Sequence, residues 1–171
     1  MESKKKTIFL EKKSQFESKA GNFKIECFPT SIWEISIYNA WSNILGSFMP
    51  NKDKIKQLLN KYCQACQADE VVLFERNTFL YISSFNNKNF KDNERFERIS
   101  EEMKKFKNIC QKDSKKFNHF LIKNVKNYIY LDEFANSTCI MTVLSNKSVT
   151  LELLKINIEI SKKNFTEIME N

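Results

Sequence analysis

The stretch ADEVVLFERNTFLYIS, residues 68–83, decides the fold because it predicts a β-hairpin. Residues 71–74 form a continuous run of β-branched and bulky apolar side chains, and residues 79–83 are again rich in aromatic and apolar ones, as strands are. The connection over residues 75–77 is short, and Asn77 tolerates the positive φ that tight hairpin turns require. We therefore expect two neighbouring antiparallel strands.

Further helices and strands flank this hairpin. A helix is expected before it, over residues 52–67, and another after it, over residues 93–111, because apolar side chains recur there at steps of three and four. Three more strands and a last helix are predicted at residues 117–123, 128–134, 138–145 and 150–167. A sheet of this kind buries its apolar side chains only if helices cover its faces. The predicted fold class is α/β in the broad sense (α+β), an antiparallel five-stranded sheet with helices on both faces.

The first part of the chain predicts a separate helix–strand–helix unit. Residues 8–19 favour a helix, and Phe23–Phe28 alternates apolar with charged residues at the period of a strand. Residues 37–48 place apolar side chains along one face of a second helix, and Thr30 and Ser31 are suited to cap its start. The predicted boundary with the next domain falls near residue 48.

The composition narrows the function classes. The net charge is +7, but Arg, the residue best suited to phosphate and base recognition, is scarce, and the lysines are spread along the chain. We therefore expect no nucleic-acid partner. The chain has 2 Gly, too few for a Gly-rich phosphate-binding loop. No apolar run approaches the roughly 20 residues that span a bilayer, so a membrane would be reached only through partners.

Side chains that could catalyse a reaction or bind a metal are few. The five cysteines are scattered and odd in number, which indicates reduced cytosolic thiols. Cys63 and Cys66 have CxxC spacing, but the chain has no second such pair and a single histidine, so we expect them to pack in a helix without a metal. His119 lies in an apolar run and favours a structural or interface role. We expect no catalytic residue.

Several runs, in order along the chain, carry a family resemblance. They include Thr30-Ser31-Ile32-Trp33 with Ala40-Trp41-Ser42, Ala68–Arg76, Arg95-Phe96-Glu97 with Ile99-Ser100, and Ser137-Thr138 with Met141. Together they resemble the Rag small GTPases, and the A type rather than the C type. The resemblance implies a roadblock/longin-like domain over residues 49–171, preceded by the C-terminal remnant of a Ras-like G domain over residues 1–48.

The same resemblance bears on nucleotide binding. It implies that Thr30, Ser31 and Ile32 form part of a loop whose backbone amides lie near a guanine base. Affinity for GTP comes from a phosphate loop, a lysine and magnesium ligands, which this sequence does not contain. GTP or GDP and magnesium are therefore expected as cofactors of the full-length family, and none is expected to bind this chain alone.

The resemblance also implies pairing between two roadblock domains. The expected interface residues lie on the helix after the hairpin and on the strand next to it: Phe96, Ile99, Met103, Phe106, Phe117, Phe120, Leu121 and Ile122. The implied partner is a C-type Rag subunit, with self-association left open. The pair would rest on a roadblock scaffold complex, peripheral on the lysosomal or vacuolar membrane, and signal amino-acid supply to the TOR kinase complex.

One alternative interpretation stays open. A stand-alone roadblock/longin-like adaptor of vesicle traffic or dynein would show the same sheet and helices. The run Thr30–Trp33 argues against it, because such adaptors carry no end of a G domain.

Overall fold

The computed structural model describes residues 2–88, 92, 94–112, 119–135 and 137–170. The chain divides into two compact units, Met1–Ala40 and Trp41–Asn171. In the described part of the chain, no helix is both long and apolar enough to cross a membrane.

The first unit contains helix α1, Glu2–Lys19, and the start of helix α2, Ser36–Phe48. α1 ends where Gly21 adopts a positive φ of 58°, the left-handed conformation that favours glycine. The strand expected at residues 23–28 is not formed, and residues 23–31 belong to no helix or strand. That prediction was wrong because alternation alone does not make a strand. A strand also needs a neighbour that pairs with its backbone, and the described residues provide none for this segment.

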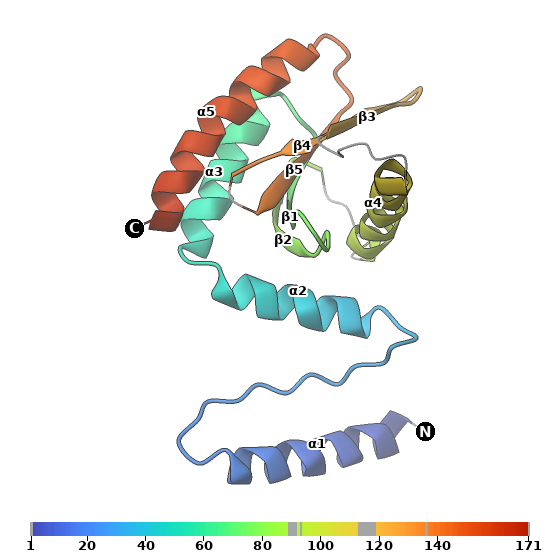
Figure 1. The fold of residues 1–171 in the computed structure, drawn as a ribbon, viewed down its shortest axis with the longest axis vertical. Coiled ribbons are helices and arrows are strands. Elements are labelled where there is room, and N and C mark those ends of the chain that lie inside the picture. The colour runs from blue at the N-terminus through green and yellow to red at the C-terminus, as the bar shows by residue number, and fades with distance from the viewer. Residues whose placement is uncertain (1, 89–91, 93, 113–118, 136, 171) are drawn as a thin grey trace. The chain divides into compact units, whose positions relative to one another are not determined.

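The second unit contains one antiparallel sheet. Its five described strands are arranged in the order β2-β1-β5-β4-β3, so β2 and β3 are the edges (Figure 1). The strands are β1 (Glu70–Glu75), β2 (Tyr81–Asn86), β3 (His119–Lys123), β4 (Tyr128–Glu133) and β5 (Thr138–Leu144). The expected hairpin is confirmed, because β1 and β2 pair along their length, from Glu70 opposite Asn86 to Phe74 opposite Tyr81.

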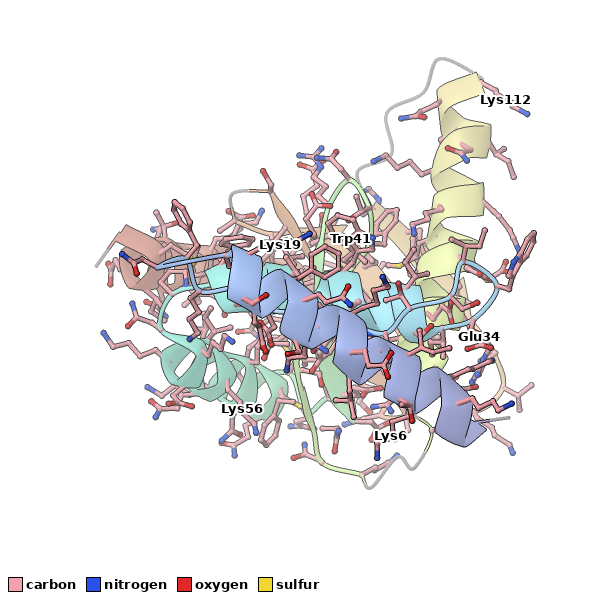
Figure 2. The ribbon with its side chains drawn as sticks, turned by 90° about the horizontal axis from the view of Figure 1, so that it is seen from below. Lys6, Lys19, Glu34, Trp41, Lys56 and Lys112 are labelled. Atoms are coloured by element: carbon pink, nitrogen blue, oxygen red, sulfur yellow. The ribbon has the colours of Figure 1, made fainter. Side chains whose placement is uncertain are left out.

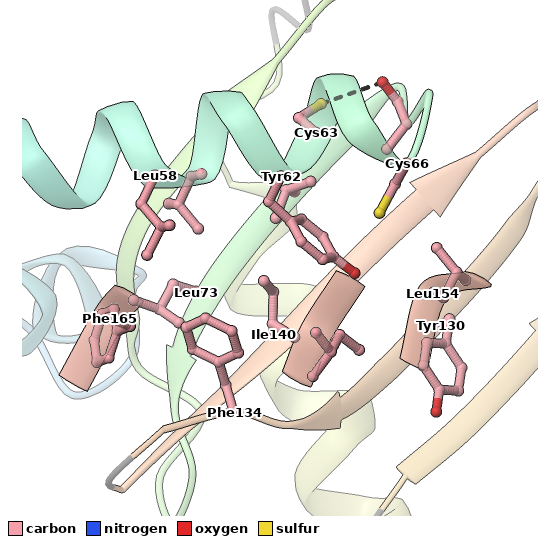
Figure 3. Close-up of a cluster of buried hydrophobic side chains, with 14 of the residues drawn as sticks. Leu58, Tyr62, Cys63, Cys66, Leu73, Tyr130, Phe134, Ile140, Leu154 and Phe165 are labelled. Atoms are coloured by element: carbon pink, nitrogen blue, oxygen red, sulfur yellow. Dashed lines mark hydrogen bonds between the residues drawn. The ribbon is translucent and has the colours of Figure 1, made fainter. Parts of the chain in front are cut away.

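Helices cover both faces of this sheet, as expected. α3 (Lys52–Ala65) and α5 (Leu151–Glu170) lie together on one face, and α4 (Arg95–Lys112) lies on the other (Figure 1). The core is therefore split into two layers. Figure 3 shows the first, in which Leu58 and Tyr62 of α3 meet sheet residues such as Leu73 and Ile140.

The interior strand β1, which lies between β2 and β5, explains why both layers are needed. Its side chains alternate between the two cores, with Val71 and Leu73 facing α3 and α5, and Val72 and Phe74 facing α4. All four are completely buried. A strand that is apolar on both faces is stable in water only if each face is covered, so β1 fixes the three-layer arrangement.

The turn of the hairpin differs from expectation in one detail. The residue with positive φ is Phe79, at 52°, rather than Asn77. Glu75 holds the turn in place, since its carboxylate accepts hydrogen bonds from the backbone N–H groups of Asn77 and Thr78, at 2.9 and 2.7 Å. Burial of the Phe79 ring, which is completely enclosed, compensates for the unusual backbone at that residue.

Candidate assembly surface on α4 and β3

β3 is one of the two edge strands of the sheet, and its residues line a groove together with residues of α4. Among the strands that the structure describes, β3 pairs with β4 alone, from His119 opposite Asp132 to Lys123 opposite Tyr128. The other long side of an edge strand presents N–H and C=O groups that are able to pair with another strand. Alternation places Phe120 and Ile122 on the α4 face of the sheet, and Ile122 is 49% exposed. β3 therefore combines an open backbone edge with exposed apolar surface.

α4 is held firmly against the sheet at both of its ends. At its start, the Arg95 guanidinium lies 2.6 Å from the Glu70 carboxylate of β1, and both side chains are largely buried. Near its other end, the Lys107 ammonium donates to the backbone carbonyls of Arg76 and Asn77 in the hairpin turn, at 3.4 and 3.2 Å. These contacts tie α4 to β1 and to the hairpin turn.

A groove of about 420 Å³ runs between α4 and β3. Its floor is the α4 face of the sheet, including Ile129 and Met141. The rings of Phe106 and Phe120 meet across it with centroids 6.0 Å apart. Six of the residues expected at an interface line this groove: Ile99, Met103, Phe106, Phe120, Leu121 and Ile122.

The structure separates the expected interface residues by their exposure. Phe106 is 50% exposed, like Ile122, whereas Met103 is 2% exposed and belongs to the core beneath α4. Phe96 packs inside the domain, stacked on Tyr81 with ring centroids 4.5 Å apart. Phe117 lies outside the described residues. Ile129 and Met141 line the groove but were not predicted, because the sequence pattern of their strands does not show which face of the sheet they belong to.

The rim of the groove is charged. On α4, Arg98 pairs with Asp92, and Lys105 pairs with Glu102 at 2.7 Å. Alternation along β3 places Lys123 on the face opposite the groove, and its ammonium lies 5.6 Å above the ring of Tyr128. Lys56 of α3 and Lys112 at the end of α4, both labelled in Figure 2, belong to helices on opposite faces of the sheet.

The loop expected near a guanine base belongs to the first unit. Ser36 of α2 accepts a hydrogen bond from the Ser31 N–H at 2.9 Å, and the Ser31 hydroxyl accepts one from the Trp33 N–H at 3.3 Å. Thr30 precedes these contacts, and the Ile32 side chain is 73% exposed. The hydroxyls of Ser31 and Ser36 therefore shape the loop before α2, whereas the expectation was that Thr30 or Ser31 would cap the helix itself.

The cysteines on α3 lie in the core. Cys63 donates a hydrogen bond to the carbonyl of Ala68 at 3.2 Å, and the Asn157 amide approaches the sulfur of Cys66 at 3.4 Å. Burial raises the pKa of the Cys63 thiol to about 11 and also raises that of Cys66, so both thiols stay protonated at neutral pH. Within the residues that the structure describes, no three His, Cys, Asp or Glu side chains gather where they could hold a metal ion.

Solved structures identify the class of domain that this geometry defines. MglB of Myxococcus xanthus matches 70% of this chain and 90% of its own, with a TM-score of 0.59 at 16% identity. A Roadblock/LC7 domain from Streptomyces avermitilis matches 68% of this chain and 98% of its own, with a TM-score of 0.51 at 10% identity. At such identities the likeness shows the fold alone. The second unit is a roadblock-like α+β domain, and the predicted fold class is confirmed.

Sequence comparison identifies the family. The model of the Gtr1/RagA G protein conserved region matches residues 1–103. Ras-related GTP-binding protein A of Dictyostelium discoideum is 35% identical over 99% of this chain and 56% of its own length. GTP-binding protein GTR1 of Saccharomyces cerevisiae is 34% identical over 92% of this chain and 54% of its own length. The chain belongs to the Gtr1/RagA family of G proteins, and it spans about half the length of these curated relatives.

Proposed function

We propose that this chain works as the C-terminal, assembly-forming region of a Rag-type GTPase. Through α4 and β3 it pairs with the roadblock domain of a C-type Rag subunit, and the pair docks on a roadblock scaffold complex. In this role it is peripheral on a lysosomal or vacuolar membrane and reports amino-acid supply to the TOR kinase complex. The observation that carries the pairing is the open edge of β3 beside an apolar groove lined by α4.

Two contributions make pairing at this surface favourable. A strand added along β3 would satisfy backbone groups that water otherwise solvates, which gives the pair a defined register. Covering Phe106 and Ile122, each about half exposed, would add the apolar burial that drives association, at roughly 25 cal/mol for each Å² removed from water. Backbone pairing sets the direction and register of the added strand, and apolar burial supplies most of the affinity.

The test replaces Ile122 by Asp. Ile122 is a better choice than its neighbour Leu121, because Leu121 also packs against the core of its own domain. Sedimentation equilibrium of the chain, alone and mixed with a C-type Rag roadblock domain, is expected to show association that Ile122→Asp weakens at least tenfold, since a carboxylate would be buried without a partner. Ile160→Asp is the matched control, because Ile160 is 56% exposed on α5, on the other face of the sheet.

Two results would refute the pairing surface. One is association that Ile122→Asp leaves unchanged, and the other is an equal loss with Ile160→Asp. Circular dichroism of both variants establishes that the sheet is still folded.

We also propose that nucleotide binding needs residues beyond this chain. The backbone amides of a loop such as Thr30–Ile32 select a base but contribute little affinity, and the phosphates need a Gly-rich loop and a lysine. Isothermal titration of the 171-residue chain with GTP and magnesium is expected to show no micromolar binding. Micromolar affinity would contradict this part of the proposal.

A further inference from the structure

The pattern of charge along β3 indicates which kind of strand can pair with it. The strand reads HFLIK and contains a lysine and a histidine but no acid. The turn that follows adds Lys126, and the next acid along the chain is Asp132 of β4. Within the described residues, Lys123 has the Tyr128 ring beside it and no carboxylate partner. Any strand that pairs with β3 therefore lies beside the positively charged Lys123 at the end of β3.

Self-pairing through this edge has a fixed geometry. When two copies of one strand pair as antiparallel neighbours, the two-fold axis is perpendicular to the sheet and passes midway between the two copies of one residue. The register that pairs all five residues of β3 is centred on Leu121. It places His119 of each copy directly opposite Lys123 of the other, with Cβ atoms about 5 Å apart. Both ends of a self-pair would then lack a charge-balancing group for Lys123.

The surroundings of His119 do not change this conclusion. On its own sheet, His119 lies opposite Asp132, and its ring centroid is 6.2 Å from that of Tyr130. The Asp132 carboxylate already accepts a hydrogen bond from the Tyr130 hydroxyl at 2.6 Å. It also lies one strand further from the second copy than His119 does. Asp132 is therefore poorly placed to pair with Lys123 of another chain.

We infer that the strand that pairs with β3 carries a carboxylate opposite Lys123, so that a second copy of this chain, which presents His119 there, is the weaker partner. This inference rests on the proposed pairing through α4 and β3 and adds the chemistry of the partner strand. The net charge of +7 acts in the same direction, because two copies repel each other and an acidic partner is attracted. Lys123 is thus a specificity-determining residue of the surface.

A single substitution, His119→Glu, can create the missing carboxylate within this chain. In a self-pair of this variant, each end gains a contact between Lys123 of one copy and the introduced carboxylate of the other. A mixed pair with the unmodified chain gains one such contact, and the unmodified self-pair gains none. Because an opposite-charge pair across two strands contributes roughly 0.2–1 kcal/mol, the self-pair of the variant is expected to have about a fivefold lower dissociation constant. The mixed pair is expected to lie between the two.

The experiment measures dissociation constants by sedimentation equilibrium at low salt for three variants: His119→Glu, Gln57→Glu, and His119→Glu combined with Lys123→Gln. Gln57→Glu makes the same charge change on the exposed side of α3 and is expected to have no comparable effect. Adding Lys123→Gln to His119→Glu is expected to remove the gain. The inference is overturned if His119→Glu associates no more tightly than Gln57→Glu, or if its gain survives Lys123→Gln.

This result is independent of the test of the proposed function. If Ile122→Asp leaves every association unchanged, pairing does not use β3 and the proposed function itself fails. If Ile122→Asp dissociates the pairs but His119→Glu brings no gain, the pairing surface stands and only the inference about the partner's carboxylate falls.

Discussion

Arg95 of α4 and Glu70 of β1 form an ion pair at 2.6 Å, with side chains that are 15% and 5% exposed. The Arg95 guanidinium also lies 4.2 Å above the centre of the Phe96 ring. The pair joins the first turn of the helix that lines the groove to β1, an interior strand of the sheet. The position of the candidate assembly surface therefore depends on a charge contact inside the domain.

Removing one member of this pair is expected to destabilise the domain strongly. Arg95→Met keeps an apolar stem over Phe96 but leaves the Glu70 carboxylate buried without a cation, which costs about 3 kcal/mol of unfolding free energy. Urea denaturation followed by circular dichroism measures the change. Arg98→Met is the control on the same helix, because Arg98 forms an exposed pair with Asp92, and it is expected to cost less than about 1 kcal/mol. Equal costs would contradict the role of the buried pair.

A second prediction concerns a contact between two hydroxyls in the core layer that α3 and α5 cover. Tyr62 of α3 and Thr142 of β5 are hydrogen-bonded at 3.0 Å, and both are buried. Tyr62→Phe leaves the Thr142 hydroxyl without this partner and is expected to lower the unfolding free energy by about 1–2 kcal/mol. The double variant Tyr62→Phe/Thr142→Val is expected to lose less than the sum of the two single losses. Strict additivity in urea titrations would show that the hydroxyls do not interact.

The hairpin turn is expected to make stability depend on pH. Burial alone would raise the pKa of the Glu75 carboxyl, but hydrogen bonds from the Thr78 side chain and from the N–H groups of Asn77 and Thr78 outweigh it and lower the pKa. The stability that these hydrogen bonds contribute is fully present above the pKa of Glu75 in the unfolded chain, about 4.3. It is lost as the pH falls through the lower pKa of Glu75 in the folded protein.

Glu75→Gln tests this dependence. The variant is expected to be less stable than the unmodified chain by about 1 kcal/mol at pH 7, because the turn loses its charged acceptor. The difference is expected to shrink as the pH falls below about 4, where the carboxyl of the unmodified chain becomes protonated. A constant difference between neutral and strongly acidic pH in thermal or urea unfolding would contradict the assignment.

The cysteines are expected to react with a thiol reagent in two groups. Burial raises the pKa of Cys139 to about 12 and that of Cys63 to about 11, and it also raises that of Cys66. Cys27 and Cys110 are partly exposed. At mildly alkaline pH the native protein is therefore expected to react quickly at Cys27 and Cys110, and at the other three only after unfolding in urea. Mass spectrometry of the labelled peptides assigns the sites, and equal rates at all five would refute the burial of the thiols.

Much of the fold was predictable because the sequence pattern around the hairpin is local. The run Val71–Phe74 indicates a strand buried on both faces, and the stripes of α3, α4 and α5 indicate the helices that cover it. The segment 23–28 was predicted wrongly because its alternation is equally local, whereas a strand depends on a neighbour elsewhere in the chain. Positive φ at Phe79 was also missed, since it follows from the turn contacts of Glu75 and not from the residue type.

The candidate surface was predictable only in outline. The stripe of α4 identifies apolar residues, but helical spacing does not say which of them face the helix's own sheet. Met103 and Phe96 pack against the sheet. Phe106 remains half exposed, because β3 is the edge of the sheet and no described strand lies beyond it to cover that part of α4. The contact between Lys123 and the ring of Tyr128 depends on strand register, which the sequence pattern does not specify.

The segment of residues 23–31, which forms neither helix nor strand, has a practical consequence for handling the protein. A protease needs several consecutive residues in extended form to fill its binding cleft, and this segment offers them without prior unfolding. Lys24 lies within it and is exposed, whereas the lysines of α3 and α5 are held in helices. Brief trypsin digestion would therefore cut after Lys24 more readily than within α3 or α5, and a single cut there leaves a fragment that still contains the entire sheet.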